Sequence, residues 1–218
     1  MAAALLNWLG ARKRGRQTGR VVKGMDVLQG PRPLAIARGC MVKKLLYMLL
    51  VVMVYAIVHE GAHAILATLA GEYQAFHVRP FGLEVTYTTP VGERHGIHWA
   101  FIAGFSNALT MSIGYALFAV RRRIASIPVP FIKDLGYYAT VLFMVLDPIN
   151  LGVGPFIYRG DAIGVAVGLG VSRYVVQGIS LAVLLLNREL VVREVFRTFR
   201  VQTRHPLFQP LTRVRRAS

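Results

Sequence analysis

The chain has 218 residues, of which 55% are hydrophobic, and it carries a formal net charge of +16. This composition excludes an ordinary soluble globular domain, and the single cysteine, Cys40, excludes an intrachain disulfide and a multi-cysteine metal site. Several apolar runs are long enough to cross a bilayer, which predicts one multi-pass integral membrane domain.

Lysines and arginines gather beside these apolar runs, at residues 12–44, at 121–123 and from 188 to the end. Basic flanks are typical of cytoplasmic loops and of contacts with anionic lipid head groups. We therefore expect both termini and the 121–135 loop on the cytoplasmic side of the membrane. No nucleic-acid recognition motif accompanies the charge, so a nucleic-acid partner is not expected.

Residues 1–43 are basic and rich in glycine, and we expect a flexible N-terminal arm there. The first predicted span runs from Lys44 to Leu69, and Gly71 ends it, since glycine often follows a helix. In the segment 75–98, apolar and polar residues alternate around Val85, with the period of a strand, before a turn at Pro90. This segment predicts a small β-hairpin-like insert at the membrane surface.

The later apolar runs predict three further spans, at residues 97–120, 136–169 and 173–186. Pro148 and the glycines and prolines of 150–155 interrupt the third span, because proline lacks a backbone donor. Residues 188–218 form a basic tail, whose amphipathic first part predicts a helix in the head-group region. The fold class is thus an all-α membrane protein of about four transmembrane helices, with a broken third helix.

The pentapeptide His59-Glu60-Gly61-Ala62-His63 lies in the middle of the first span. Two imidazoles four residues apart share one face of a helix and can reach one zinc ion. Glu60 would then stand beside the ion, placed to take a proton from water, as in HExxH metalloproteases. Polar packing between helices is the alternative, but ionisable groups at this depth are costly without a partner.

A catalytic zinc ion takes three protein ligands, so a third ligand must come from another part of the chain. The chain has ten acidic residues, and most fall in predicted arms, loops or the tail. Asp147 and Asp161 are the exceptions, because both lie beside the break in the third span. Asp147 could instead be a turn residue before Pro148, and Asp161 could cap a helix.

With these motifs in order, residues 44–187 resemble the site-2 proteases, a family of intramembrane zinc metalloproteases. HExxH corresponds to residues 59–63, and the stretch Ala103-Gly104-Phe105-Ser106-Asn107 is similar to the family's Ala-Gly-Pro-x-x-Asn, with Phe105 at the proline position. Asn150 to Pro155, followed by Gly160-Asp161-Ala162, is similar to the family's Asn-x-x-Pro and Leu-Asp-Gly elements. The resemblance implies that Asp161 is the third zinc ligand, with Asp147 as the alternative.

The resemblance also implies a function, a zinc-dependent endopeptidase with one Zn²⁺ per chain that cuts membrane-protein substrates in or near their transmembrane segments. Glu60 would be the general base, and Asn107 and Asn150 would hold substrate backbone or stabilise the oxyanion. Strand-like residues near Val85 could pair with an unwound substrate by β-augmentation. A metal-binding membrane transporter and a non-catalytic, protease-like binder of membrane proteins are the alternatives.

Overall fold

The computed structural model describes residues 33–79, 82–158, 160–203 and 205–211. It is mostly helical, with four helices long and apolar enough to cross a membrane and a two-stranded hairpin after the first of them. The predicted fold class is confirmed, and these helices indicate a multi-pass membrane protein. Most of the predicted flexible arm, residues 1–32, and the end of the tail, residues 212–218, lie outside the described residues.

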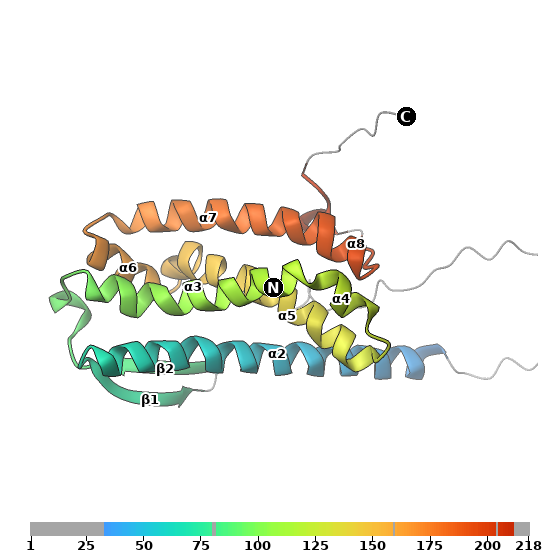
Figure 1. The fold of residues 1–218 in the computed structure, drawn as a ribbon, viewed down its shortest axis with the longest axis horizontal. Helices are drawn as coiled ribbons and strands as arrows, with labels where there is room; N and C mark the ends of the chain where they lie inside the picture. Colours follow the sequence, from blue (N-terminus) through green and yellow to red (C-terminus); the bar gives the residue numbers. More distant parts are fainter. Residues whose placement is uncertain (1–32, 80–81, 159, 204, 212–218) are drawn as a thin grey trace, which may run out of the picture.

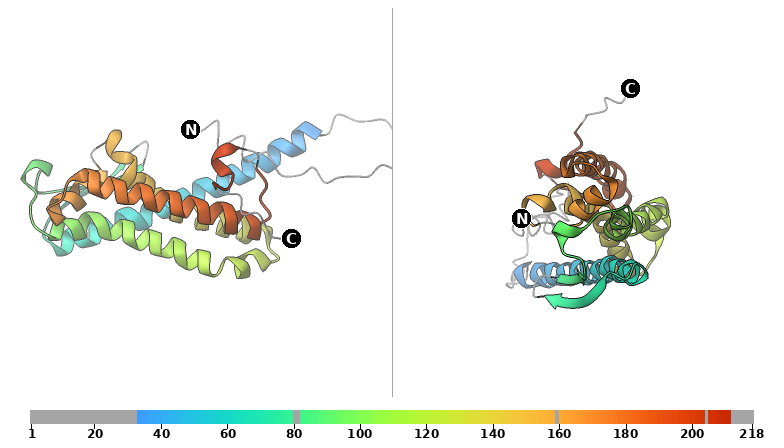
Figure 2. Two further views of the ribbon diagram at one scale, coloured as in Figure 1. Left: turned by 90° about the horizontal axis from the view of Figure 1, so that it is seen from above. Right: turned by 90° about the vertical axis from the view of Figure 1, so that its left-hand side faces the viewer.

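The first helix, α2 (Pro33–Leu69), begins well before the predicted start of the span at Lys44. Residues 33–43 of the predicted arm are therefore helical, with Pro33 at the first position of the helix, where proline is favoured. The N-terminal part of α2 projects beyond the other helices (Figures 1 and 2). The helix ends as predicted, and Gly71 follows it with a φ of +73°.

The hairpin consists of β1 (Tyr73–Arg79) and β2 (Gly82–Tyr87), which pair antiparallel. It runs alongside the C-terminal part of α2 (Figure 1), and Val85 of β2 is buried. Glu72 closes the base of the hairpin, since its carboxylate accepts a hydrogen bond of 2.8 Å from Thr88 Oγ1 and one of 3.2 Å from Thr89 N. These hydrogen bonds hold the pKa of Glu72 below its usual value.

The helices from the hairpin to α7 are, in chain order, η1 (Val91–Glu93), α3 (His98–Ala119), α4 (Arg121–Ser126), α5 (Pro130–Gly152), η2 (Gly154–Phe156), α6 (Gly160–Leu169) and α7 (Arg173–Leu190). Helices α3 and α5 lie between α2 and α7 (Figure 1). The break in the third span comes after Gly152 rather than at Asp147, so α5 continues as a helix through Pro148. Most of the predicted 121–135 loop is likewise helical, in α4 and the first turns of α5.

Helix α5 tolerates Pro148 because a neighbouring helix supplies the missing hydrogen bond. A proline at this position has no N–H for the carbonyl of Met144, four residues earlier. Asn187 of α7, which is fully buried, donates its Nδ2 to that carbonyl at 2.6 Å and accepts a hydrogen bond of 2.7 Å from Tyr115. In a medium without water such a partner is needed for a freed backbone carbonyl.

Helix α6 lies against α3 at a very short distance, which two glycines permit. A Cβ atom on Gly164 would stand 2.6 Å from the Cβ of Ala103, and one on Gly168 would stand 2.1 Å from the backbone nitrogen of Ala100. The GxxxG spacing is typical of close helix packing in membranes. It holds the start of α6, and with it Asp161, against α3.

The C-terminal segment differs from the predicted interfacial helix. Helix α7 continues through a π-helical turn, η3 (Val191–Val195), into α8 (Phe196–Thr198), and a 3₁₀ turn, η4 (Pro206–Phe208), follows. Val195 and Phe196 are buried in one core with Tyr137 and Met144 of α5. The apolar face of this segment therefore packs against the protein, because the turn joins it directly to α7.

Candidate metal centre

Helix α2 presents His59 and His63 on one face, one turn apart, with ring centroids separated by 4.9 Å. Both side chains are buried, at 5% and 2% exposure. His59 lies ten residues before the end of the helix, which is about 15 Å at the rise of an α-helix. If the edge of a hydrocarbon core of about 30 Å lay at the end of the helix, His59 would be close to its middle.

The two imidazole rings are oriented by partners of their Nδ1 atoms. Nδ1 of His59 lies 3.2 Å from the carboxylate of Asp147, and Nδ1 of His63 donates to the backbone carbonyl of Ile102 at 2.7 Å. With a proton on Nδ1, each ring would present the lone pair of Nε2 to a metal ion. Such outer partners are usual for histidines that ligate metals.

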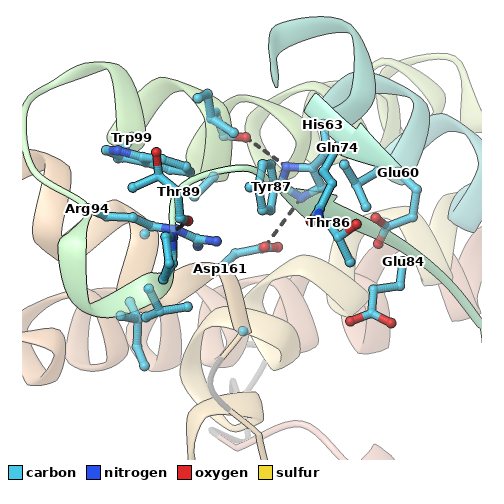
Figure 3. A pocket seen from close by; sticks show the side chains of 18 of the residues that line it. Glu60, His63, Gln74, Glu84, Thr86, Tyr87, Thr89, Arg94, Trp99 and Asp161 are labelled. Atoms are coloured by element: carbon cyan, nitrogen blue, oxygen red, sulfur yellow. Dashed lines mark hydrogen bonds and ion pairs between the residues drawn. The ribbon is translucent and has the colours of Figure 1, made fainter. Parts of the chain in front are cut away.

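Both Nε2 atoms face Asp161, at the first turn of α6. The distances to its carboxylate oxygens are 3.2 Å from His59 and 3.3 Å from His63 (the latter ion pair is drawn in Figure 3). The three potential ligand atoms lie within 4.8 Å of one another. This group could hold a metal ion, as the sequence predicted for these three residues.

The donor set suits a divalent metal ion such as zinc. Two ligands of a tetrahedral zinc ion at about 2.0–2.1 Å are about 3.3–3.4 Å apart; each Nε2 lies at about that distance from one carboxylate oxygen of Asp161, and the three potential ligand atoms lie within 4.8 Å of one another. Two imidazoles and one carboxylate leave a fourth position open, the pattern of catalytic rather than structural zinc sites. The same donors also suit other divalent metals, so the identity of the ion belongs to the proposal below.

Asp147, the alternative third ligand, lies on the other side of the His59 ring. Its carboxylate is 1% exposed and accepts hydrogen bonds of 2.6 Å from Tyr55 and 2.7 Å from Thr110. It faces Nδ1 of His59 and is not part of the group that could hold an ion. Between the two aspartates, the geometry favours Asp161 as a ligand and gives Asp147 the place of an outer partner.

Asn107 of α3 and Asn150 of α5 both hydrogen bond to the proposed third ligand. Their Nδ2 atoms donate to Oδ2 of Asp161 at 3.0 Å and 2.7 Å. Tyr158 donates its hydroxyl to Oδ1 of Asn150, which fixes the orientation of that amide. These contacts hold the Asp161 carboxylate in place, while the predicted contact of the two asparagines with substrate remains a prediction.

Glu60 is next to the histidines in sequence but faces a cavity of about 460 Å³ (Figure 3). The cavity is lined by His63 and Asp161 on one side and by the strand β2, residues 83–87, on another. The backbone of Val85 approaches the Glu60 carboxylate. The volume is typical of a ligand-binding cavity, and it brings a potential base, the ligand group and a strand edge together.

Sequence reasoning missed four polar side chains around this site: Tyr55, Ser106, Thr110 and Tyr158. Helical spacing could have found the first and third, because Tyr55 lies one turn before His59 and Thr110 one turn after Asn107. The Ser106 hydroxyl lies 2.8 Å from Nε2 of His63 and so stands beside the ligand group. Nothing in the sequence marks Tyr158, which lies between two helices; burial and the nearby Asp161 raise its pKa.

Comparisons with known proteins add no relative to this picture: the chain matches no protein-family model, no curated protein and no solved structure.

Proposed function

We propose that the chain is a zinc-dependent intramembrane endopeptidase, with His59, His63 and Asp161 as metal ligands and Glu60 as general base. One observation carries the proposal: two buried imidazoles on one face of an apolar helix of spanning length turn their Nε2 atoms to one carboxylate. The order of motifs along the sequence supports it independently. Substrates would be membrane proteins with a helix that can unwind next to the cavity.

The zinc ion would supply Lewis acidity, which makes a water molecule acidic enough to lose a proton near neutral pH. Glu60 would accept that proton and pass it to the leaving amine, a role for which its place on the cavity wall beside His63 is suited. The strand β2 would hold an extended substrate segment by its free edge, so that the peptide bond to be cut lies next to Glu60. Asn107 and Asn150 would keep Asp161 oriented throughout.

The arrangement of basic residues supports an orientation in which both termini are cytoplasmic. The arginine-rich helix α4, the helix α8 and the start of α2 lie at one end of the bundle, opposite the hairpin (Figure 1). Arg121 of α4 pairs with Glu194 of η3 at 2.9 Å, which ties two of these segments together. By the positive-inside rule this end would face the cytoplasm, and the cavity beside the hairpin would open toward the other side.

The proposal is tested with purified wild type, Glu60→Gln, Asp161→Asn and the control Glu93→Gln, an exposed carboxylate that does not line the cavity. Zinc content and cleavage of model transmembrane substrates are measured for each. We expect one zinc ion per chain and cleavage in the wild type and the control. Glu60→Gln should keep zinc and lose activity by about 10²–10⁴-fold, and Asp161→Asn should lose both.

Two outcomes would contradict the proposal. If the wild-type protein binds no divalent metal, the polar cluster serves only to pack the helices together. Protein that binds zinc and carries it across liposome membranes, but cuts no substrate, would be a transporter.

A further inference from the structure

Arg94 is a cation in the cavity wall that forms no ion pair with a described carboxylate. It lies between η1 and α3 and lines the cavity together with Glu60, Glu84 and Asp161. Its Nε donates to the backbone carbonyl of Thr89 at 3.1 Å. Among the residues that the structure describes, Arg94 forms no salt bridge, whereas the arginines at 79, 121, 188 and 193 each do.

Two aromatic rings hold the Arg94 guanidinium in place. It lies 4.3 Å from the ring centroid of Trp99 and 4.7 Å from that of Tyr87. Trp99 is only 1% exposed, so this ring provides a fixed surface. The terminal nitrogens of Arg94 keep donors for a further partner, because its hydrogen bond to Thr89 uses only Nε. Figure 3 shows the side chain reaching into the cavity from the side of Trp99.

The state of this cation favours an anionic partner. Arg94 is half-buried, and burial lowers the pKa of its guanidinium, since the charge has lost part of its water shell. A carboxylate can accept two parallel hydrogen bonds from a guanidinium, which makes arginine a specific partner for that group. No other arginine or lysine lines the cavity within the described part of the chain.

The position of Arg94 relative to β2 sets where a partner group would lie. Glu60 is beside Val85, and β2 ends at Tyr87, on whose ring Arg94 packs. Two strand residues span about 7 Å. A peptide held along the free edge of β2 would therefore reach Arg94 about two to four residues from the bond next to Glu60.

We propose that Arg94 forms an anion subsite of the cavity, which takes a carboxylate of the bound peptide about two to four residues from the bond next to Glu60. The acceptor is an aspartate or glutamate side chain or the peptide's C-terminal carboxylate, since both present the same group. The position of the subsite relative to a cut bond rests on the proposed protease function. The preference of the subsite for a carboxylate does not require cleavage and can be measured by binding alone.

The test measures binding and cleavage separately. Labelled model transmembrane peptides carry a single Asp, or Asn in its place, at successive positions on either side of the cleavage region. A second pair ends in a free carboxylate or in an amide. Binding is measured with Glu60→Gln protein in lipid nanodiscs, and cleavage with the otherwise wild-type protein. Each is repeated with Arg94→Gln, Arg94→Glu and the charge-matched control Arg122→Gln, which lies on α4 at the other end of the bundle.

We expect Asp to bind about tenfold more tightly than Asn at one position, a size appropriate to a half-exposed charged hydrogen bond. Arg94→Gln should remove the preference, Arg94→Glu should transfer it to a peptide with Lys at that position, and Arg122→Gln should keep it. If only the chain-end pair differs in binding, the carboxylate is the C-terminus. If Arg94 only stabilised the fold, Arg94→Glu would not change the preference from Asp to Lys.

The two proposals fail in different ways. Equal binding of every acidic and neutral pair by the Glu60→Gln protein overturns the subsite, even if the wild type cuts its substrates and even if Arg94 variants do not fold. An acidic preference that depends on Arg94, in a protein that cuts nothing, supports the subsite and contradicts the protease function.

Discussion

The carboxylate of Asp147 lies 3.2 Å from Nδ1 of His59, while Nε2 of the same ring lies 3.2 Å from Asp161. One imidazole thus joins two aspartates, one facing the candidate metal position and one behind the ring. We predict that Asp147→Asn keeps the zinc ion but weakens its affinity about 10–100-fold, as outer partners of ligating histidines do. Chelator competition followed by metal analysis measures this.

Asp161→Asn supplies the comparison, because it should abolish stoichiometric zinc binding under the same conditions. Asp134→Asn, at the start of α5 and away from the ligand group, should change neither. The reverse order, with zinc lost in Asp147→Asn and kept in Asp161→Asn, would make Asp147 the third ligand.

The free edge of β2 gives a second prediction. Directly opposed residues in an antiparallel ladder alternate between hydrogen-bonded and non-hydrogen-bonded pairs. The backbone of Val85 approaches Glu60 and so faces away from β1, which makes the pair of Val85 with Phe76 a non-hydrogen-bonded pair. The pair of Leu83 with Val78, two residues along, is of the same kind. Leu83→Pro should therefore leave the hairpin paired but remove a donor from the free edge, and we expect a higher KM for cleavage with zinc still bound.

Val78→Pro is the matched control, since Val78 pairs with Leu83 and its N–H points away from β2 by the same alternation. It is 80% exposed, so the substitution disturbs little packing. Cleavage should stay close to wild type in this variant. Unchanged cleavage in Leu83→Pro would exclude β-augmentation at this edge.

Tyr158 gives a third prediction, because its hydroxyl donates to Asn150, which in turn donates to Asp161. Tyr158→Phe leaves Oδ1 of Asn150 without this donor and lets the amide turn. One neutral hydrogen bond is worth about 0.5–1.5 kcal/mol, so zinc affinity should fall by about two- to tenfold. Titration with a fluorescent zinc chelator would resolve this change.

Tyr174→Phe is the control, since Tyr174 is 63% exposed at the start of α7. Its zinc affinity should equal that of the wild type. If Tyr158→Phe behaves in the same way, Asn150 is oriented without the tyrosine.

Two glycines provide a matched pair for stability. Gly168→Ala places a Cβ 2.1 Å from the backbone of Ala100, so α6 must move away from α3. Overpacking of this kind costs about 1–3 kcal/mol or more, and the thermal midpoint in detergent should fall. Gly178→Ala in α7 meets nothing within 4 Å, and its midpoint should hold or rise, because alanine favours helix by about 1 kcal/mol over glycine. A stable Gly168→Ala variant would show that α6 is free to shift.

The fold was predictable where a local pattern determines it. Apolar length marked the four spans, and alternation marked the hairpin. The break in the third span was predicted to begin at Pro148, but it comes after Gly152. The sequence shows that Pro148 frees a carbonyl, but it does not show that Asn187, far along the chain, will bind that carbonyl. The buried face of the C-terminal segment was missed for a similar reason. An amphipathic pattern identifies an apolar face without saying whether lipid or protein covers it.

The candidate metal site was likewise predictable only in its local part. His59, Glu60 and His63 follow from helical spacing, which is local. Asp161 and Asp147 entered the prediction as the two aspartates beside the break in the third span, and the resemblance favoured Asp161. Only the packing of α6 on α3 shows how Asp161 reaches the histidines. The outer partners, such as Tyr55 behind His59 and Asp147, depend on which helices are neighbours, and spacing within one helix does not specify that.

The hydrogen bond from Asn187 to Met144 has a consequence for movement within the bundle. A helix with an unsatisfied carbonyl at a proline can flex there, since nothing fixes the angle between its two halves. Here α7 satisfies that carbonyl, and separating the two helices would leave it without a partner away from water. Movement of α7 away from α5 is therefore opposed at the proline, next to Asp147 and Asn150, which contact His59 and Asp161.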